Sequence, residues 1–293
     1  MTAVPSGTTA ACSAGAARCV LAPIVEHRRI ADRTWRIRLD CPEIAAAAVP
    51  GQFAMLRIPG RVDPLLARPL AVYDTFAVDG RPRHADFVYL VHGKFTTALA
   101  TLRPGDEVAA WGPLGNGFDP PPVDHLLLVA GGIGQTALLA LARERLGRAA
   151  YGVPARPAPR ARRATFCWGA ATADRFGEVD DFRHAGCDVH LATLDGSAGV
   201  RGTVIDLLRG LFADRVPDSL HVACCGPEPM MAAVSRWAAE AGAGCDVSLE
   251  APMACGVGIC FTCVARVRDA AGGWDYRRTC IEGPVFPGAA IEW

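Results

Sequence analysis

The chain has 293 residues, of which 51% are hydrophobic, so it is long enough to bury one large core or two to three smaller ones. Its 30 basic and 30 acidic residues give a formal net charge of zero, which provides no electrostatic case for binding nucleic acid or an anionic membrane. These properties indicate a globular protein that acts on small molecules or on protein partners.

The N-terminal residues are small and polar, with no basic start followed by an apolar block, and we expect residues 1–19 to form a flexible tail. No uninterrupted apolar stretch approaches the roughly 20 residues needed to cross a bilayer. The sequence therefore indicates a cytoplasmic protein. Its twelve cysteines then lie in a reducing compartment, where clustered cysteines bind metal more often than they form disulfides.

From residue 20 to 119 the sequence consists of short apolar runs separated by Gly, Pro and Asp. Short strands at this spacing are typical of an antiparallel barrel or sandwich. Within this region Arg68 stands directly before Pro69, where a fixed guanidinium fork suits two oxygens of a pyrophosphate. An ordinary exposed arginine is the alternative interpretation.

From residue 120 to 243 strand-like runs alternate with helix-like runs, which predicts βαβ units around a parallel sheet. The segment LLLVAGGIGQTALL, residues 126–139, has the pattern of a strand, a glycine-rich turn and a helix. Such a turn brings the phosphates of a dinucleotide close to backbone N–H groups at a helix start. The full G-x-G-x-x-G fingerprint is absent, and a plain tight turn is the alternative. The glycines concerned are Gly131, Gly132 and Gly134.

A second strand-to-helix turn, LHVACCGPEPMM, occupies residues 220–231. Parallel sheets bind ligands at the carboxyl ends of their strands, so the sulfur of Cys225 is a candidate neighbour of a nicotinamide ring. Cys224 alternates to the other face of the strand. Gly226 and Pro227 complete the turn and are expected to contact the same nucleotide.

Residues 145–163 interrupt this region with a segment rich in Pro and Arg. We expect a solvated loop between a helix and the next strand. Docking of a phosphate or of a partner is the alternative function for its arginines.

The last segment, residues 244–293, holds four cysteines in the spacing C-x4-C-x2-C-x16-C. Plant-type [2Fe–2S] proteins use C-x4-C-x2-C with a distant fourth cysteine. Gly256 and Gly258 permit the tight turn that such a loop needs. A zinc site and a thiol–disulfide pair are the alternatives, but zinc ribbons normally pair two C-x2-C knuckles, and disulfide exchange leaves two cysteines unexplained. The expected cluster ligands are Cys255, Cys260, Cys263 and Cys280.

The order of these motifs, with SLEAPMACGVGICFTC and CIEGPVFPG in the last segment, is similar to the ferredoxin-reductase superfamily. The resemblance is greatest to the electron-transfer subunits of NAD-dependent dihydroorotate dehydrogenases, and it covers residues 20–293. It implies an α+β multi-domain fold: an antiparallel flavin-binding barrel at 20–119, an α/β nucleotide-binding domain with a parallel sheet at 120–243, and a small [2Fe–2S] domain at 244–293.

The resemblance also assigns flavin-binding residues within the barrel. Two positions depart from the family pattern: Ala71 lacks a hydroxyl that bonds the flavin, and Phe95 replaces a glycine where the backbone passes close to the cofactor. The implied flavin-binding residues are Arg68, Pro69, Leu70, Ala71, Val88, Tyr89, Leu90, Phe95 and Thr96.

The function implied by the resemblance is electron transfer with three cofactors, FAD, NAD and a [2Fe–2S] cluster. A separate FMN-containing catalytic subunit, in a heterotetramer of two plus two, would oxidise dihydroorotate in pyrimidine (UMP) biosynthesis. Two rivals stay open: the same module serving another partner, as an NADPH:ferredoxin transhydrogenase or a hydrogenase, and a non-enzymatic redox sensor. The coenzyme preference is undecided, because Asp174 suits a ribose hydroxyl and Arg175 suits a 2′-phosphate.

Overall fold

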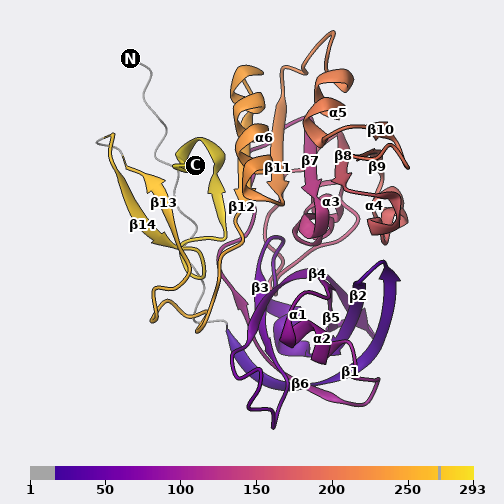
Figure 1. Cartoon of the computed structure of the whole chain (residues 1–293), viewed down its shortest axis with the longest axis vertical. Helices are drawn as coiled ribbons and strands as arrows, with labels where there is room; N and C mark the ends of the chain where they lie inside the picture. The colour runs from indigo at the N-terminus through magenta and orange to yellow at the C-terminus, as the bar shows by residue number, and fades with distance from the viewer. Residues whose placement is uncertain (1–16, 270–271) are drawn as a thin grey trace.

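The computed structural model describes residues 17–269 and 272–293 of the chain. They form a closed barrel, a seven-stranded sheet and a C-terminal segment with a two-stranded sheet (Figure 1). The tail expected at residues 1–19 falls outside the described residues up to residue 16, and Arg18 and Cys19 already belong to the first strand. Within the described part of the chain, every helix is too short or too polar to cross a bilayer.

The barrel confirms the antiparallel architecture predicted for the first part of the chain. Its strands are β1 (Arg18–Ala31), β2 (Thr34–Asp40), β3 (Phe53–Arg57), β4 (Arg68–Val78), β5 (Arg81–Leu90) and β6 (Glu107–Leu114), and its helices are α1 (Pro42–Ala47) and α2 (Lys94–Leu99). The strands close in the order β1-β2-β5-β4-β3-β6. Because side chains alternate along each strand, Ile37 and Leu39 of β2 meet Phe87 of β5 and Val108 of β6 in a dry interior.

The seven-stranded sheet confirms the predicted parallel core. Its strands are β7 (His125–Gly131), β8 (Arg163–Ala170), β9 (Cys187–Thr193), β10 (Val200–Arg201), β11 (Leu220–Cys225), β12 (Gly244–Ser248) and β15 (Val285–Pro287). They lie in the order β10-β9-β8-β7-β11-β12-β15, and only β15 at the edge runs antiparallel to its neighbour. Both β12 and β15 come from residues 244–293, so the segment expected to form the cluster domain also completes this sheet.

Helices cover both faces of the sheet, because alternate residues of the central strand β7 are apolar on both sides. Leu126 and Leu128 face one buried cluster and Leu127 and Val129 face the other. The helices are α3 (Leu139–Arg145) and α4 (Val179–Ala185) on the first side, and α5 (Val204–Leu211) and α6 (Glu228–Glu240) on the second.

Residues 145–163 connect α3 to β8, as expected, and most of them are exposed, but the segment is anchored at a few buried side chains. Arg145 is 1% exposed, and its guanidinium donates to two backbone carbonyls of the proline-rich linker after β6, over 2.8 Å each. Tyr151 is buried and donates its hydroxyl to Asp74 of β4 over 2.7 Å. The segment packs against the barrel because its polar groups find acceptors there, which a sequence pattern cannot reveal.

A buried ion-pair network connects the barrel to helix α4. Asp86 of β5 is fully buried and accepts hydrogen bonds from Arg36 over 2.6 Å and Arg38 over 2.7 Å. Arg36 also pairs with Asp181 of α4 over 3.0 Å, and the hydroxyl of Tyr73 donates to the same carboxylate over 3.0 Å. This network, the Asp86 network, fixes the barrel against the sheet and therefore sets the geometry of any site between them.

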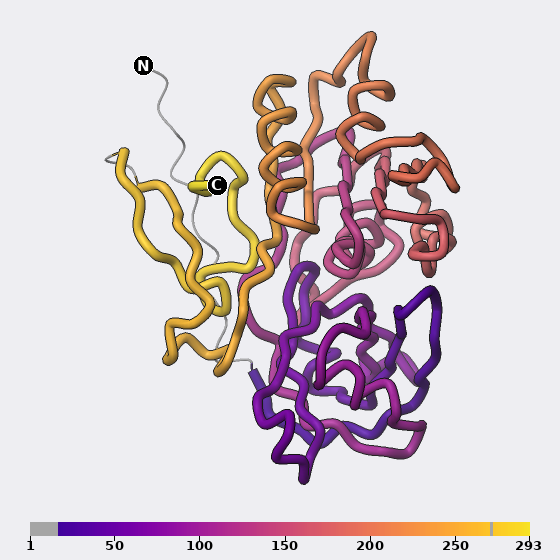
Figure 2. The backbone as a smooth tube through the Cα atoms, in the orientation of Figure 1, coloured from indigo at the N-terminus to yellow at the C-terminus, as the bar shows by residue number. Residues whose placement is uncertain are grey.

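The C-terminal segment leaves the sheet after β12, crosses to the barrel and returns at β15. The tube in Figure 2 shows this gold-to-yellow segment beside both other parts of the molecule. Between the two sheet strands it forms an irregular loop with the first three cysteines and the hairpin β13 (Val264–Arg268) and β14 (Trp274–Arg278).

Candidate functional site

A cavity of about 830 Å³ lies where the barrel meets the carboxyl edge of the parallel sheet. Barrel residues of β4, β5 and α2 line one side, Cys225 and the turn after β7 line a second, and residues 248–254 with Thr262 line a third. Every residue that the family resemblance assigned to the flavin lies on the lining of this cavity, namely Arg68, Pro69, Leu70, Ala71, Val88, Tyr89, Leu90, Phe95 and Thr96.

Arg68 brings a positive charge to a lining that is mostly apolar. Its guanidinium donates to the carbonyls of Leu66 and Ala67 over 3.1 and 3.0 Å, and among the described residues no carboxylate pairs with it. These two carbonyls orient the side chain without neutralising it. An oriented guanidinium with free charge at a cofactor-sized cavity supports the pyrophosphate interpretation over that of an ordinary surface arginine.

Replacing Arg68 with alanine is expected to weaken FAD binding about tenfold, because a hydrogen bond to a charged group contributes about 1.5 kcal/mol at an accessible site. Titration of the flavin-free protein with FAD, followed by quenching of flavin fluorescence, measures the effect. Arg61→Ala is the matched control, since Arg61 is an exposed arginine in the same connection that does not line the cavity. Equal FAD affinity of Arg68→Ala and the wild type would contradict the assignment.

The two positions that depart from the family pattern, Phe95 and Ala71, lie in different surroundings within the barrel. Phe95 is 3% exposed and joins the buried core of the barrel, so its ring is accommodated mainly by the barrel interior. The adjacent Thr96 hydroxyl accepts a hydrogen bond from the backbone N–H of His92 over 2.7 Å and closes the start of α2. Ala71 pairs with Phe53 in the strand register and contributes no polar group to the cavity.

Tyr89 is a cavity residue whose polar group is engaged elsewhere. Its ring is 1% exposed, and its hydroxyl makes a hydrogen bond of 2.8 Å with the imidazole of His27. Burial raises the pKa of this phenol above its ordinary range. Tyr89 therefore stays protonated and supports the cavity wall.

The two strand-to-helix turns pack directly against each other. A side chain at Gly134 would meet the carbonyl oxygen of Cys225 at 2.1 Å, so glycine is required there by close approach of the second turn. At Gly132, in contrast, a side chain's first carbon would have no atom of the described residues within 4 Å beyond its chain neighbours. The predicted helix after the glycines is confirmed as α3, but it begins only at Leu139, because residues Gly132–Ala137 form the 3-10 helix η2.

None of the turn residues Gly131, Gly132, Gly134, Gly226 and Pro227 is on the lining of the 830 Å³ cavity. They lie at the carboxyl ends of β7 and β11, beside the cavity residues Ile133 and Cys225. A nucleotide bound along this edge would lie outside the flavin cavity and reach into it at Cys225.

Cys225 lies at the carboxyl end of β11 and is 4% exposed. Burial raises the pKa of its thiol, and the nearby carboxylate of Glu250 raises it further, so the sulfur stays protonated. The expected alternation is confirmed, because Cys225 joins the buried cluster on one face of the sheet and Cys224 the cluster on the other.

Glu250 is a cavity residue that sequence reasoning did not single out. It follows β12 by two residues and is accessible from the cavity, yet the surrounding protein raises the pKa of its carboxyl through burial. The sequence did contain a signal for Glu250. It is an acidic residue that comes shortly after a strand of the parallel sheet, and that strand is the neighbour of the one that ends at Cys225.

The residues after β8 bear on the choice of coenzyme. Arg175 pairs with Asp32 over 3.3 Å, and Asp32 also pairs with Arg29 over 2.9 Å. Asp174 accepts a hydrogen bond from the hydroxyl of Thr172 and is exposed. Because Asp32 is shared by two arginines, it neutralises the charge of Arg175 only in part, and this edge offers both an acidic group to a ribose and a cation to a 2′-phosphate.

The four C-terminal cysteines interact with one another, and Cys255 also influences Cys280. The Cys260 thiol interacts with Cys255, and the Cys280 thiol interacts with Cys263. A hydrogen bond from Thr262, with a further contribution from Cys255, lowers the pKa of Cys260 to about 6, whereas burial and the neighbouring Cys263 raise the pKa of Cys280 to about 12.

A [2Fe–2S] cluster needs two thiolates on each of two irons, which matches these four cysteines. A zinc ribbon normally takes its ligands from two C-x2-C knuckles, and of these four cysteines only Cys260 and Cys263 have that spacing. The donor set therefore fits a two-iron cluster better than zinc.

The cluster loop, residues 252–263, is built onto the barrel. The indole N–H of Trp111 in β6 donates to the carbonyl of Cys255 over 3.2 Å. Gly256 has a φ of 73°, and a side chain there would meet Met55 of the barrel at 2.6 Å. The expectation that this turn requires glycine is thus confirmed. The outer side of the loop is apolar, with Ile259 79% and Phe261 59% exposed.

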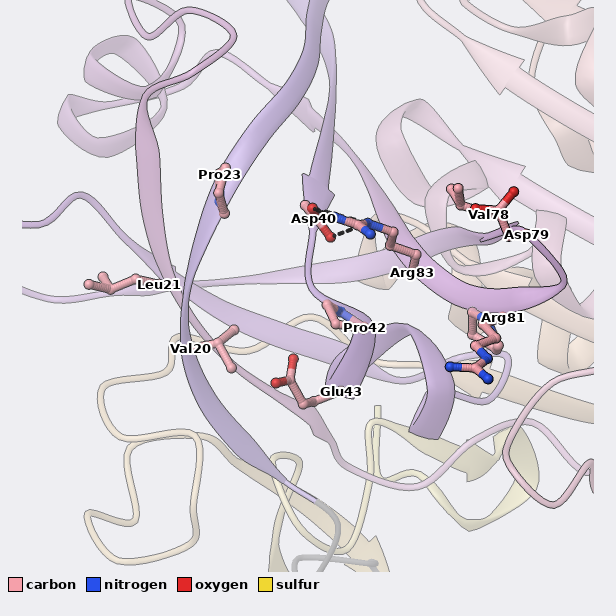
Figure 3. Close-up of a pocket in the computed structure, with 11 residues that line it drawn as sticks. Val20, Leu21, Pro23, Asp40, Pro42, Glu43, Val78, Asp79, Arg81 and Arg83 are labelled. Atoms are coloured by element: carbon pink, nitrogen blue, oxygen red, sulfur yellow. Dashed lines mark hydrogen bonds and ion pairs between the residues drawn. The ribbon is translucent and has the colours of Figure 1, made fainter.

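A second cavity, of about 770 Å³, lies on the outside of the barrel (Figure 3). Asp40 and Arg83 face each other across it and form an ion pair of 2.7 Å, so much of its charge is compensated. No residue that the sequence singled out lines this cavity.

Comparison with known proteins agrees with the cluster geometry. The family model described as the iron-sulfur cluster binding domain of dihydroorotate dehydrogenase B matches residues 250–292. A protein of Desulforamulus reducens, named dihydroorotate dehydrogenase B (NAD(+)), electron transfer subunit, is 36% identical over 266 residues, which cover 90% of this chain and 94% of that protein. A protein of the same name from Geobacillus thermodenitrificans is 35% identical, with coverage of 90% and 94%.

Solved structures show the same fold. The NADH-dependent reduced ferredoxin-NADP oxidoreductase, solved in work on flavin-based electron bifurcation, superposes with a TM-score of 0.76 at 30% identity, over 94% of this chain and 90% of that one. The ferredoxin reductase of carbazole 1,9a-dioxygenase superposes with a TM-score of 0.63 at 19% identity, over 78% and 67%. The second likeness bears on the fold alone.

Proposed function

Because this chain belongs to the family of electron transfer subunits of NAD(+)-dependent dihydroorotate dehydrogenase B, we propose that it conducts electrons from a dihydroorotate-oxidising partner to NAD+. It does so with FAD in the 830 Å³ cavity, a [2Fe–2S] cluster on the four cysteines and NAD(H) at the carboxyl edge of the sheet. The observation that carries the proposal is that the cluster loop and Cys225 line one and the same cavity.

When bound, FAD exchanges hydride with a nicotinamide and single electrons with the cluster. The chain supplies binding and orientation. Arg68 holds the pyrophosphate, the protonated thiol of Cys225 packs beside the nicotinamide, and Thr262 forms part of the wall towards the cluster. The pairing of Arg36 with Asp181 in the Asp86 network holds the barrel against helix α4 of the nucleotide-binding part.

The partner in this proposal is a catalytic subunit that carries FMN and oxidises dihydroorotate to orotate in pyrimidine biosynthesis. The assembly is a heterotetramer of two plus two in the cytoplasm. Support for the docking position comes from the cluster loop, where Val257, Ile259 and Phe261 expose large apolar side chains beside the cysteines. Apolar side chains exposed together are typical of protein interfaces.

A second candidate function is supported by the likeness to the NADH-dependent reduced ferredoxin-NADP oxidoreductase. In that case the same cofactors would serve a ferredoxin-type partner. The curated relatives, whose names specify NAD(+), favour NAD and the dihydroorotate partner.

Reconstitution tests the proposed function. We expect dihydroorotate-dependent reduction of NAD+ only when the chain is mixed with the FMN-containing subunit, since neither half has the complete path. Ile259→Glu is expected to weaken that complex at least tenfold, because it places a charge in an apolar contact. Isothermal titration calorimetry of the cluster-loaded protein measures the affinity.

Leu21→Glu is the matched control, because Leu21 is an apolar residue of the barrel surface that is 59% exposed. Unchanged affinity of Ile259→Glu with an intact cluster would refute the docking position. Oxidation of dihydroorotate by this chain alone would contradict the proposal that a separate catalytic subunit carries out that step.

A further inference from the structure

Thr262 occupies a junction between the two expected redox centres. Its hydroxyl donates a hydrogen bond to the sulfur of Cys260 over 3.2 Å, and the same residue lines the flavin cavity. It is exposed, so neither packing nor the barrel core requires a threonine at this position.

A hydrogen bond to a cysteine ligand stabilises negative charge on the sulfur, and it does so more strongly after an electron has been added. We propose that Thr262 is a positioning residue that raises the reduction potential of the cluster through its hydrogen bond to Cys260. The inference rests on the proposed function, because it requires that Cys260 ligates iron.

The hydroxyl of Thr262 differs from the backbone donors near the cysteine sulfurs, of which Val257 is one. The backbone N–H of Val257 donates to the sulfur of Cys255 over 3.4 Å, and that contact exists whatever the side chain. The bond to Cys260 depends on one side chain. A substitution at Thr262 can therefore shift the cluster potential while it leaves the loop and all four ligands in place.

Thr279 provides a matched comparison within the same segment. It precedes the ligand Cys280 and is fully buried, and its hydroxyl has no hydrogen-bond partner among the described residues. The same chemical change, threonine to valine, thus removes a hydrogen bond to the sulfur of Cys260 at Thr262, and at Thr279 it removes no hydrogen bond to another described residue.

The experiment compares wild type, Thr262→Val, Thr262→Ser and Thr279→Val, each loaded with about two irons and two sulfides per chain. Redox titration followed by electron paramagnetic resonance gives the cluster potential. For Thr262→Val we expect the ratio of reduced to oxidised cluster at a fixed potential to fall about tenfold, which corresponds to a shift of about 59 mV to lower potential. Thr262→Ser, which keeps the hydroxyl, and Thr279→Val should titrate like the wild type.

An unchanged potential in Thr262→Val, or an equal shift in Thr279→Val, would overturn the inference. Thr262→Ala replaces the valine variant if valine disturbs cluster loading, with the same expected shift. A wild-type protein that binds no iron would instead overturn the proposed function, and the inference with it, so the two failures are distinguishable by metal analysis.

Discussion

Replacing Cys263 with serine is expected to abolish dihydroorotate-dependent reduction of NAD+ by the reconstituted complex. Cys263 is 2% exposed and pairs with Cys280, so no water or other side chain can readily replace its thiolate on iron. Activity should fall at least 100-fold, to background. NADH-driven reduction of an artificial dye through FAD should survive, because Cys225 and Arg68 lie on other parts of the cavity.

Metal analysis of anaerobically purified protein provides the companion measurement. The wild type should contain about two irons and two sulfides per chain and Cys263→Ser should contain none. Cys19→Ser is the control, since Cys19 lies exposed on β1 and is far in the sequence from the four cluster cysteines. One zinc per chain without iron in the wild type would end the cluster assignment.

Replacing Asp86 with alanine is expected to lower the free energy of unfolding by about 3–5 kcal/mol, the usual result of removing one partner from a buried ion pair. Asp86 is fully buried and is the shared acceptor for both Arg36 and Arg38, so the variant removes the most buried carboxylate from both guanidinium groups, although Arg36 keeps its pair with Asp181. Urea denaturation followed by tryptophan fluorescence measures the loss.

Asp40→Ala is the matched control on the same barrel. Asp40 pairs with Arg83, whose side chain is 54% exposed, and such a solvated pair contributes only about 0–1 kcal/mol. Equal destabilisation by the two substitutions would show that the buried pairs of Asp86 contribute no more to stability than a solvated surface pair.

Local patterns in the sequence were sufficient for the architecture and for the loop that holds three of the four candidate cluster cysteines. The spacing of short strands predicts the barrel, and the alternation of strands with helices predicts the parallel sheet. Both patterns are visible in the sequence because the buried face of each element is marked by apolar residues at a regular period. The spacing of Cys255, Cys260 and Cys263 identifies one loop, since ligands this close in sequence must also be close in space.

Features that depend on distant contacts were not predictable. The burial of Arg145 depends on carbonyls of a linker that precedes it by more than twenty residues. The 3-10 helix after Gly131 reflects the close approach of the second turn at Gly134, which no local propensity encodes. Glu250 becomes a cavity residue only because β12 joins the sheet next to β11.

Because the chain returns to the sheet at β15, the cluster-bearing segment, residues 250–283, is an insertion between two paired strands. Both of its ends are held by the sheet. Leu249 donates its backbone N–H to the carbonyl of Pro284 over 2.8 Å, so the points of departure and return are hydrogen-bonded neighbours. Truncation after residue 243 would remove two strands of the sheet, whereas excision of residues 250–283 with a short turn in their place would keep β12 and β15 paired. Such a deletion would uncover Met55 and Trp111 on the barrel, and a polar replacement of both would complete the design of a cluster-free flavoprotein.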